Sequence, residues 1–186
     1  ALNLFILRMQ RRGWSLARIF QELVQKHPQK SCFIMDDKVC SFQQVEDFST
    51  KIGSYFKQQG LKKGDCIALL MDPRPEYVGT WLGLSKLGVT TALINSHLRK
   101  ATLLHCLKVA NARAIIVGTE LISVLEEVYE SSEDINTITV YQYSDEEQKS
   151  NKEFRLMKGI YVFKSNYPSP LITYFFLQEL LTSVRH

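Results

Sequence analysis

Patterns typical of strands and of helices alternate along the chain from residue 66 to residue 141. Residues 66–71 are apolar throughout, as expected of a strand buried on both faces of a sheet. Pro75 then stands at the first turn of a predicted helix, which Gly88 ends. Because such alternation is typical of β–α–β units, the sequence predicts an α/β fold: an open, mainly parallel sheet with helices on both faces.

The rest of the chain up to Tyr143 supplies further elements of the same kinds. Ser15 is placed to cap a helix that ends near His27, and residues 31–35 and 38–41 predict a hairpin. Ser41 caps the next helix with Gln44 in a capping box, and Gly60 ends that helix in the left-handed conformation. We expect further strands over 89–94, 114–117 and 135–141, and helices over 100–110 and 120–130.

Composition excludes several classes of protein. The length of 186 residues matches one globular domain or a piece of a larger one. The composition, with 45% hydrophobic and 23% charged residues, is that of an ordinary globular protein. No apolar run approaches the roughly 20 residues that a membrane-spanning helix needs. The four cysteines lack metal-binding or redox spacing, so we expect free thiols. His97 and His105 have no ligand-spaced partner, so no metal site is expected.

Charge is distributed unevenly. Residues 1–30 carry six basic residues against Glu22 alone, and within residues 1–12 an apolar cluster is flanked by Arg8, Arg11 and Arg12. This pattern predicts contact of residues 1–12 with a membrane surface; the alternative is a helix packed on the domain. Residues 120–148 carry nine carboxylates and no Lys or Arg. Because they would repel phosphates, no nucleic-acid partner is expected.

Two loops follow strands of the predicted sheet and are weak candidates for cofactor binding. Open α/β sheets bind ligands at the carboxyl ends of their strands, where Asn95, Arg99 and Arg74 are expected. Arg99 can meet an anion, although a solvated helix start is the favoured explanation. The glycines of the helix over 75–88 form no nucleotide-binding motif, and we interpret them as allowing that helix to lie close to the sheet. No catalytic residue is identified.

Several short motifs occur in a recognisable order. They are Ser41-Phe42-x-x-Val45, the turn Gly60-Leu61-Lys62-Lys63-Gly64-Asp65, the helix Trp81-Leu82-Gly83-Leu84-x-Lys86-Leu87-Gly88, the strand end Leu93-Ile94-Asn95, and Leu103-Leu104-His105-Cys106. Over residues 10–143 their order resembles the N-terminal part of the adenylate-forming acyl-CoA synthetases. The resemblance is strongest to the fatty acid transport proteins, also called very-long-chain acyl-CoA synthetases.

The resemblance implies a fatty acid–CoA ligase linked to fatty acid uptake. In that family a long-chain fatty acid reacts with ATP and Mg²⁺ to give an acyl-adenylate, and CoA then displaces AMP. The implied location is the cytosolic face of the endoplasmic reticulum, plasma membrane or peroxisome.

The family's Ser/Thr/Gly-rich phosphate loop ending in Lys is not found in this sequence, where Gly159 is the only glycine after Gly118. ATP, Mg²⁺ and CoA are therefore implied for a full-length member, whereas this chain alone is expected to bind none tightly and to be inactive. The alternative is a truncated, non-catalytic, membrane-associated α/β module. The predicted organisation is a membrane-proximal amphipathic segment (1–13), an AMP-dependent synthetase/ligase-like α/β subdomain (14–143) and a divergent tail (144–186).

Overall fold

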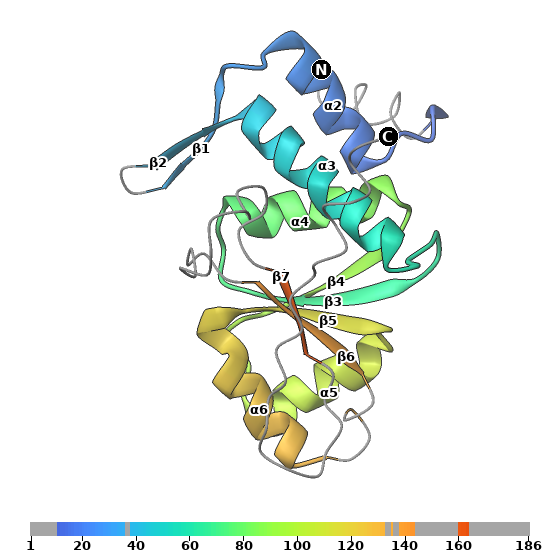
Figure 1. Ribbon diagram of the computed structural model, residues 1–186, viewed down its shortest axis with the longest axis vertical. Coiled ribbons are helices and arrows are strands. Elements are labelled where there is room, and N and C mark those ends of the chain that lie inside the picture. The colour runs from blue at the N-terminus through green and yellow to red at the C-terminus, as the bar shows by residue number, and fades with distance from the viewer. Residues whose placement is uncertain (1–10, 36–37, 133–134, 136–137, 144–159, 164–186) are drawn as a thin grey trace, which may run out of the picture. The chain divides into compact units, whose positions relative to one another are not determined.

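The computed structural model describes residues 11–35, 38–132, 135, 138–143 and 160–163 (Figure 1). The chain divides into two compact units. We call residues 1–65 with 73–91 the helical unit, and residues 66–72 with 92–186 the sheet unit. The predicted membrane segment lies almost wholly outside the described residues, and the domain boundaries at residues 13 and 143 stay predictions.

Three helices and a hairpin are among the described elements of the helical unit. These elements are α2 (Leu16–Lys26), β1 (Ser31–Met35), β2 (Lys38–Ser41), α3 (Phe42–Gln58) and α4 (Pro75–Lys86). The two strands are antiparallel, as predicted. Among the described helices, none is both long and apolar enough to cross a membrane.

Local hydrogen bonds start and end these helices where the sequence predicts. The backbone N–H of Arg18 donates to the Ser15 hydroxyl at 3.3 Å at the start of α2. At the start of α3 the Gln44 N–H donates to Ser41 Oγ at 3.2 Å, and the Ser41 N–H donates to Gln44 Oε1 at 2.8 Å. This reciprocal capping box satisfies two N–H groups that the helix itself cannot. Gly60, with φ of +79°, follows the end of α3 in the left-handed region.

Glycines let α4 approach α3 closely. A Cβ added at Gly83 would lie 2.5 Å from the backbone oxygen of Ser49, and one added at Gly79 would overlap the ring of Phe48. The approach that these glycines permit is therefore to α3 and not, as predicted, to the sheet. A helix without side chains on one stripe can bring its backbone against a neighbouring helix.

The sheet unit is built on a five-stranded sheet with the order β4-β3-β5-β6-β7. Four strands form the parallel part, and the antiparallel β7 pairs with β6 at one edge. Their bounds are β3 Cys66–Leu70, β4 Thr90–Ile94, β5 Ala114–Gly118, β6 Thr139–Tyr143 and β7 Ile160–Phe163, and the first two residues of β4 are assigned to the helical unit. The predicted α/β fold with a mainly parallel sheet is confirmed.

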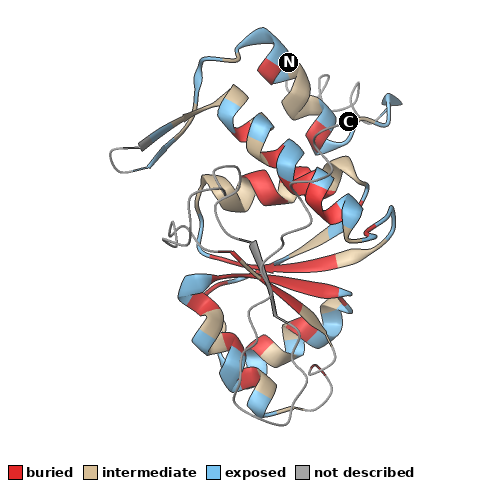
Figure 2. Cartoon of the chain, viewed as in Figure 1, coloured by how far each residue is buried: buried red, intermediate tan, exposed pale blue. Residues whose placement is uncertain are grey.

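Two helices pack on one face of this sheet, α5 (Lys100–Ala110) and α6 (Ile122–Glu130), the latter preceded by a short 3-10 helix, η1 (Thr119–Leu121) (Figure 1). Figure 2 shows that the central strands are buried along most of their length. Every residue of β5 is buried, as its apolar sequence predicts. The core beneath the helices is formed by aliphatic side chains of both helices and the sheet, among them Leu103, Leu107, Ile115, Val117, Leu125 and Val128.

One predicted strand near the end of the sheet unit needs correction, and one segment that the sequence left open contains a strand. The predicted strand over 135–141 begins only at Thr139 and continues to Tyr143. Ile135 is buried before the strand starts, so its apolar side chain belongs to the core without belonging to the sheet. The tail after Tyr143, whose structure the sequence left open, contains β7.

Candidate functional site

The carboxyl ends of parallel strands meet at one edge of a sheet, and the loops there form the candidate site. In the sheet unit these loops are Met71–Asp72 after β3, residues 95–99 after β4, and residues 119–120 after β5, which ends at Gly118. In open α/β folds this edge is where ligands bind. The ability of these loops to bind a ligand therefore depends on which of their hydrogen-bonding groups are not already used within the fold.

The loop after β4 is closed by its own hydrogen bonds. The Asn95 side chain accepts from the His97 N–H at 2.9 Å. The Arg99 guanidinium donates through Nη1 to the carbonyl oxygens of Ser96 and Leu98, at 2.5 and 2.8 Å. Two of the predicted site residues, Asn95 and Arg99, thus lie in one loop, where Arg99 Nη1 binds the loop's own backbone.

Glu120 is a feature of this edge that the sequence analysis missed. Its Oε1 accepts from the Asp72 N–H at 3.0 Å and so joins the loop after β3 to the loop after β5. A Cβ at Gly118 would meet the Glu120 carboxylate, the movable end of a flexible side chain, so the carboxylate lies directly against the end of β5. In the sequence, Gly118 at the end of a predicted strand is followed two residues later by Glu120. That spacing was the available signal for a carboxylate at the strand end, but Glu120 was interpreted only as part of the acidic surface.

A hydroxyl group fixes the neighbouring strand end. Thr119 Oγ1 donates to the Tyr143 carbonyl at 2.8 Å and accepts from Gln142 Nε2 at 3.1 Å. These bonds connect the start of η1 to the last two residues of β6. The loop after β5 is therefore held on both sides, by β6 and by the loop after β3.

The third predicted site residue, Arg74, belongs to the helical unit. It occupies the N-cap position of α4 in an extended conformation, directly before Pro75. The structure thus assigns Arg74 to one unit and the pair Asn95 and Arg99 to the other. Cofactor binding by any of the three stays a prediction.

Some of the donors in the described loops of the sheet edge are already used within the fold. A phosphate site needs several converging N–H groups and a cation. Here Arg99 Nη1 is committed to Ser96 and Leu98, and the Asp72 N–H is committed to the carboxylate of Glu120. Within the described ranges no group of three or more His, Cys, Asp or Glu residues is arranged to hold a metal ion.

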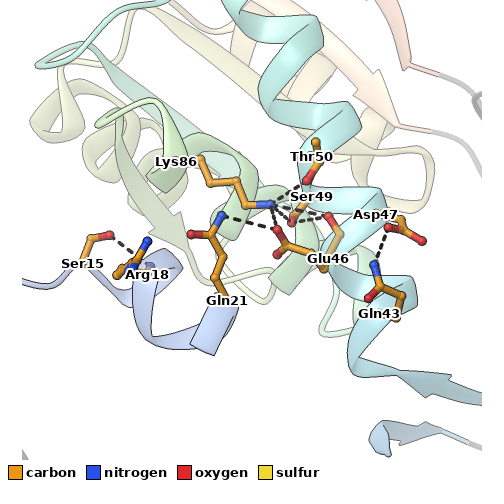
Figure 3. Close-up of polar contacts among 9 residues, drawn as sticks. All are labelled: Ser15, Arg18, Gln21, Gln43, Glu46, Asp47, Ser49, Thr50 and Lys86. Atoms are coloured by element: carbon orange, nitrogen blue, oxygen red, sulfur yellow. Dashed lines mark hydrogen bonds and ion pairs between the residues drawn. The ribbon is translucent and has the colours of Figure 1, made fainter. Parts of the chain in front are cut away.

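A second polar cluster lies within the helical unit (Figure 3). Lys86 Nζ donates to Glu46 Oε1 at 2.8 Å, to Ser49 Oγ at 2.7 Å and to Thr50 Oγ1 at 2.8 Å. Glu46 Oε1 also accepts from Gln21 of α2 at 3.4 Å. The Glu46 carbonyl oxygen, 3.5 Å from Nζ, is a fourth acceptor. Because all three donors of the ammonium group are engaged, this lysine connects helices and does not have the features of a nucleophile.

Comparison with known proteins gives one family and a consistent set of relatives. A family model described as AMP-binding enzyme matches residues 20–168. Long-chain fatty acid transport protein 1 of Homo sapiens is 36% identical over 129 residues, which are 68% of this chain and 20% of that protein. Long-chain fatty acid transport protein 6 of Homo sapiens is 35% identical over 119 residues, 63% of this chain and 19% of that protein. The chain thus spans about a fifth of the length of these curated relatives.

Solved structures share the fold. The N-terminal domain of FACL13 from Mycobacterium tuberculosis has a TM-score of 0.63 at 19% identity, covering 69% of this chain and 32% of that one. The anthranilate CoA ligase AuaEII, in complex with anthranoyl-AMP, has a TM-score of 0.57 at 25% identity, covering 61% of this chain and 22% of the ligase.

Proposed function

This chain belongs to the AMP-binding enzyme family, and from that premise we propose that it is the N-terminal α/β portion of a long-chain or very-long-chain fatty acid–CoA ligase. The observation that carries the proposal is the family match over residues 20–168, together with about 36% identity to a long-chain fatty acid transport protein. The motifs from Ser41 to Cys106 that suggested this family all lie within the matched range.

In the proposed activity, a fatty acid carboxylate attacks the α-phosphate of ATP and releases pyrophosphate, and the CoA thiol then displaces AMP from the acyl-adenylate. The described residues supply the scaffold of such an enzyme, a parallel sheet with stabilised strand ends. We assign no step to them, because the family's Ser/Thr/Gly-rich phosphate loop ending in Lys is not found in this sequence. We propose accordingly that residues 1–186 alone do not form acyl-adenylate.

A second candidate function is a non-catalytic module with the fold of the family. The hydrogen bonds of Arg99 to its own loop favour it, because they occupy donors that would otherwise be available to an anion. The two candidates differ in what the same residues do inside a complete ligase. A ligase portion supports catalysis there, whereas a module that has lost its role does not.

Pyrophosphate release tests the inactivity of the chain alone. The purified chain is given ATP, Mg²⁺, CoA and a long-chain fatty acid, and pyrophosphate is measured with and without the fatty acid. We expect the two rates to be equal. Release that depends on the fatty acid would overturn the proposal, and Arg99→Gln and Arg74→Gln would then show which predicted residue contributes.

We also propose that residues 1–12 contact an anionic membrane at its cytosolic face. The sequence supports this with Arg8, Arg11 and Arg12 beside an apolar cluster, and Arg11 and Arg12 are exposed. Each basic side chain near such a surface contributes about 1 kcal/mol, and salt weakens the attraction. In sedimentation with vesicles, replacing the three arginines with glutamine should reduce binding to anionic vesicles, whereas Lys57→Gln, at an exposed position on α3, should not. Equal binding to neutral and anionic vesicles would contradict the proposal.

A further inference from the structure

Two cysteines lie on facing strands of the hairpin in the helical unit. Cys32 is in β1 and Cys40 is in β2, and both are free thiols that are partly accessible to solvent. The strands pair Ser31 with Ser41 and Phe33 with Cys40. The pairing therefore advances by two residues in β1 and by one residue in β2, so Cys32 is the extra residue of a β-bulge.

The bulge brings the two thiols within reach of each other. At a bulge two residues of one strand oppose a single residue of the other, so Cys32 and Phe33 both face Cys40. Cys32 is the chain neighbour of Phe33, the residue that pairs with Cys40, so it lies next to the position opposite Cys40, and disulfides span about 4.4–6.8 Å between Cα atoms. The register therefore permits a cross-strand bond without separating the strands.

The electrostatics of the hairpin agree with this proximity. Burial, followed by the influence of Cys40, raises the pKa of the Cys32 thiol. One thiol changes the pKa of another in this way only when the two sulfurs are near each other. A raised pKa also means that a smaller fraction of Cys32 is present as the reactive thiolate at neutral pH.

We propose that Cys32 and Cys40 form a dithiol site that low-molecular-weight disulfides, such as glutathione disulfide, convert into an intramolecular disulfide. The Cys40 thiolate attacks one sulfur of the small disulfide, forms a mixed disulfide and releases one thiolate. The Cys32 thiolate then attacks the Cys40 sulfur, forms the cross-strand bond and releases the second thiolate. Two protein thiols are oxidised and one small disulfide is reduced to two thiols.

The hairpin is a place where such a bond has an effect. A two-stranded hairpin is marginally stable by itself. Ile34 and Val39 lie directly opposite each other and are 74% and 56% exposed, so their burial adds little stability to the hairpin. Cys40 also directly precedes Ser41, the N-cap of α3. A bond to Cys32 would tie the strands together immediately before α3 begins.

The remaining cysteines provide matched controls. Cys66 in β3 and Cys106 in α5 are partly buried against the core of the sheet unit. Their replacement by serine removes a thiol without touching the hairpin. Trypsin cleaves after Lys30, Lys38 and Lys51, so it puts Cys32 and Cys40 on separate peptides, 31–38 and 39–51.

The test is oxidation of the reduced 186-residue chain with glutathione disulfide, followed by thiol titration and non-reducing peptide mapping. We expect the loss of two thiols and a linked pair of peptides, 31–38 with 39–51, in the wild type, Cys66→Ser and Cys106→Ser. In Cys32→Ser the pair should be absent, and glutathione should accumulate on Cys40. Glutathione on both cysteines of the wild type without a linked pair, four unreacted thiols, or linkage to Cys66 or Cys106 instead would each overturn the proposal.

Discussion

The ammonium nitrogen of Lys86 lies 2.8 Å from Oε1 of Glu46, joining α4 to α3 (Figure 3). The two side chains are only 15% and 17% exposed, so this ion pair is more shielded from water than a surface pair. Ser49 and Thr50 complete the environment of the ammonium group. The pair therefore belongs to the interactions whose loss leaves a poorly solvated charge behind.

Replacing Lys86 with methionine should destabilise the chain. Met keeps an unbranched side chain only one atom shorter but leaves the Glu46 carboxylate without its cation. Hydrogen bonds to charged groups contribute about 1.5–3 kcal/mol each. We expect the free energy of unfolding, measured with urea, to fall by about 2 kcal/mol. Lys51→Met, at an exposed position on α3, is the control and should change it by less than about 0.5 kcal/mol. Equal effects of the two variants would show that the ion pair adds nothing.

Replacing Gly83 with alanine should also destabilise the chain, although alanine is the better helix former by about 1 kcal/mol. The new Cβ would lie 2.5 Å from the backbone oxygen of Ser49 and 2.9 Å from Cβ of Ile52. Neither atom can rotate away, so α4 must shift. We expect a net loss of about 1–3 kcal/mol in urea unfolding. Ser85→Ala, a replacement in the same helix that adds no atom, should stay within about 0.5 kcal/mol. A more stable Gly83→Ala variant would mean that α3 and α4 are farther apart than described.

Stability should fall at alkaline pH because of Tyr129. Burial raises the pKa of its phenol above the ordinary value of 10.0. Above that value the unfolded chain loses the phenolic proton while the folded chain retains it, so stability is full below pH 10 and declines as pH rises. The Tyr129 hydroxyl also donates to the Ile138 carbonyl at 3.2 Å, so Tyr129→Phe lowers stability at neutral pH as well.

How steeply the urea midpoint falls with pH distinguishes the raised pKa of Tyr129 from the loss of its hydrogen bond. Between about pH 9 and about pH 11 the urea midpoint of the wild type should fall more steeply than that of Tyr129→Phe. Tyr141→Phe is a useful comparison, because burial raises the pKa of Tyr141 too, while Arg113 lowers it. Parallel slopes for the wild type and Tyr129→Phe would contradict the shift at Tyr129.

The sequence predicted those parts of the fold that depend on local chemistry. Ser41 and Gln44 cap each other within three residues, and Gly60 is the residue that best tolerates a left-handed conformation after a helix, so both were predictable. The apolar run of β3 similarly required burial on both faces. Each of these features is decided by a few neighbouring residues.

The features that the sequence did not predict depend on residues far apart in the chain. Gly83 faces Ser49, and Glu120 meets the Asp72 N–H, and neither partnership leaves a local pattern. The strand β7 has four residues and is defined by its pairing with β6, so its own apolar sequence did not distinguish it. The direction of the Arg99 side chain was undecided for a related reason. A cation before a helix can face an anion or its own loop carbonyls, and only the folded loop selects the second.

The most direct test of the proposed function is a chimera. The segment of human long-chain fatty acid transport protein 1 that matches this chain at 36% identity over 129 residues is replaced by the corresponding residues of this chain. A second chimera carries the matching segment of human long-chain fatty acid transport protein 6 and controls for the junctions. Formation of long-chain acyl-CoA is measured for both, after circular dichroism and thermal unfolding confirm that each is folded. We predict that the chimera with this chain forms acyl-CoA in a reaction that depends on ATP and on the fatty acid. A folded but inactive chimera, beside an active control, would contradict the claim that these residues are the N-terminal portion of a fatty acid–CoA ligase.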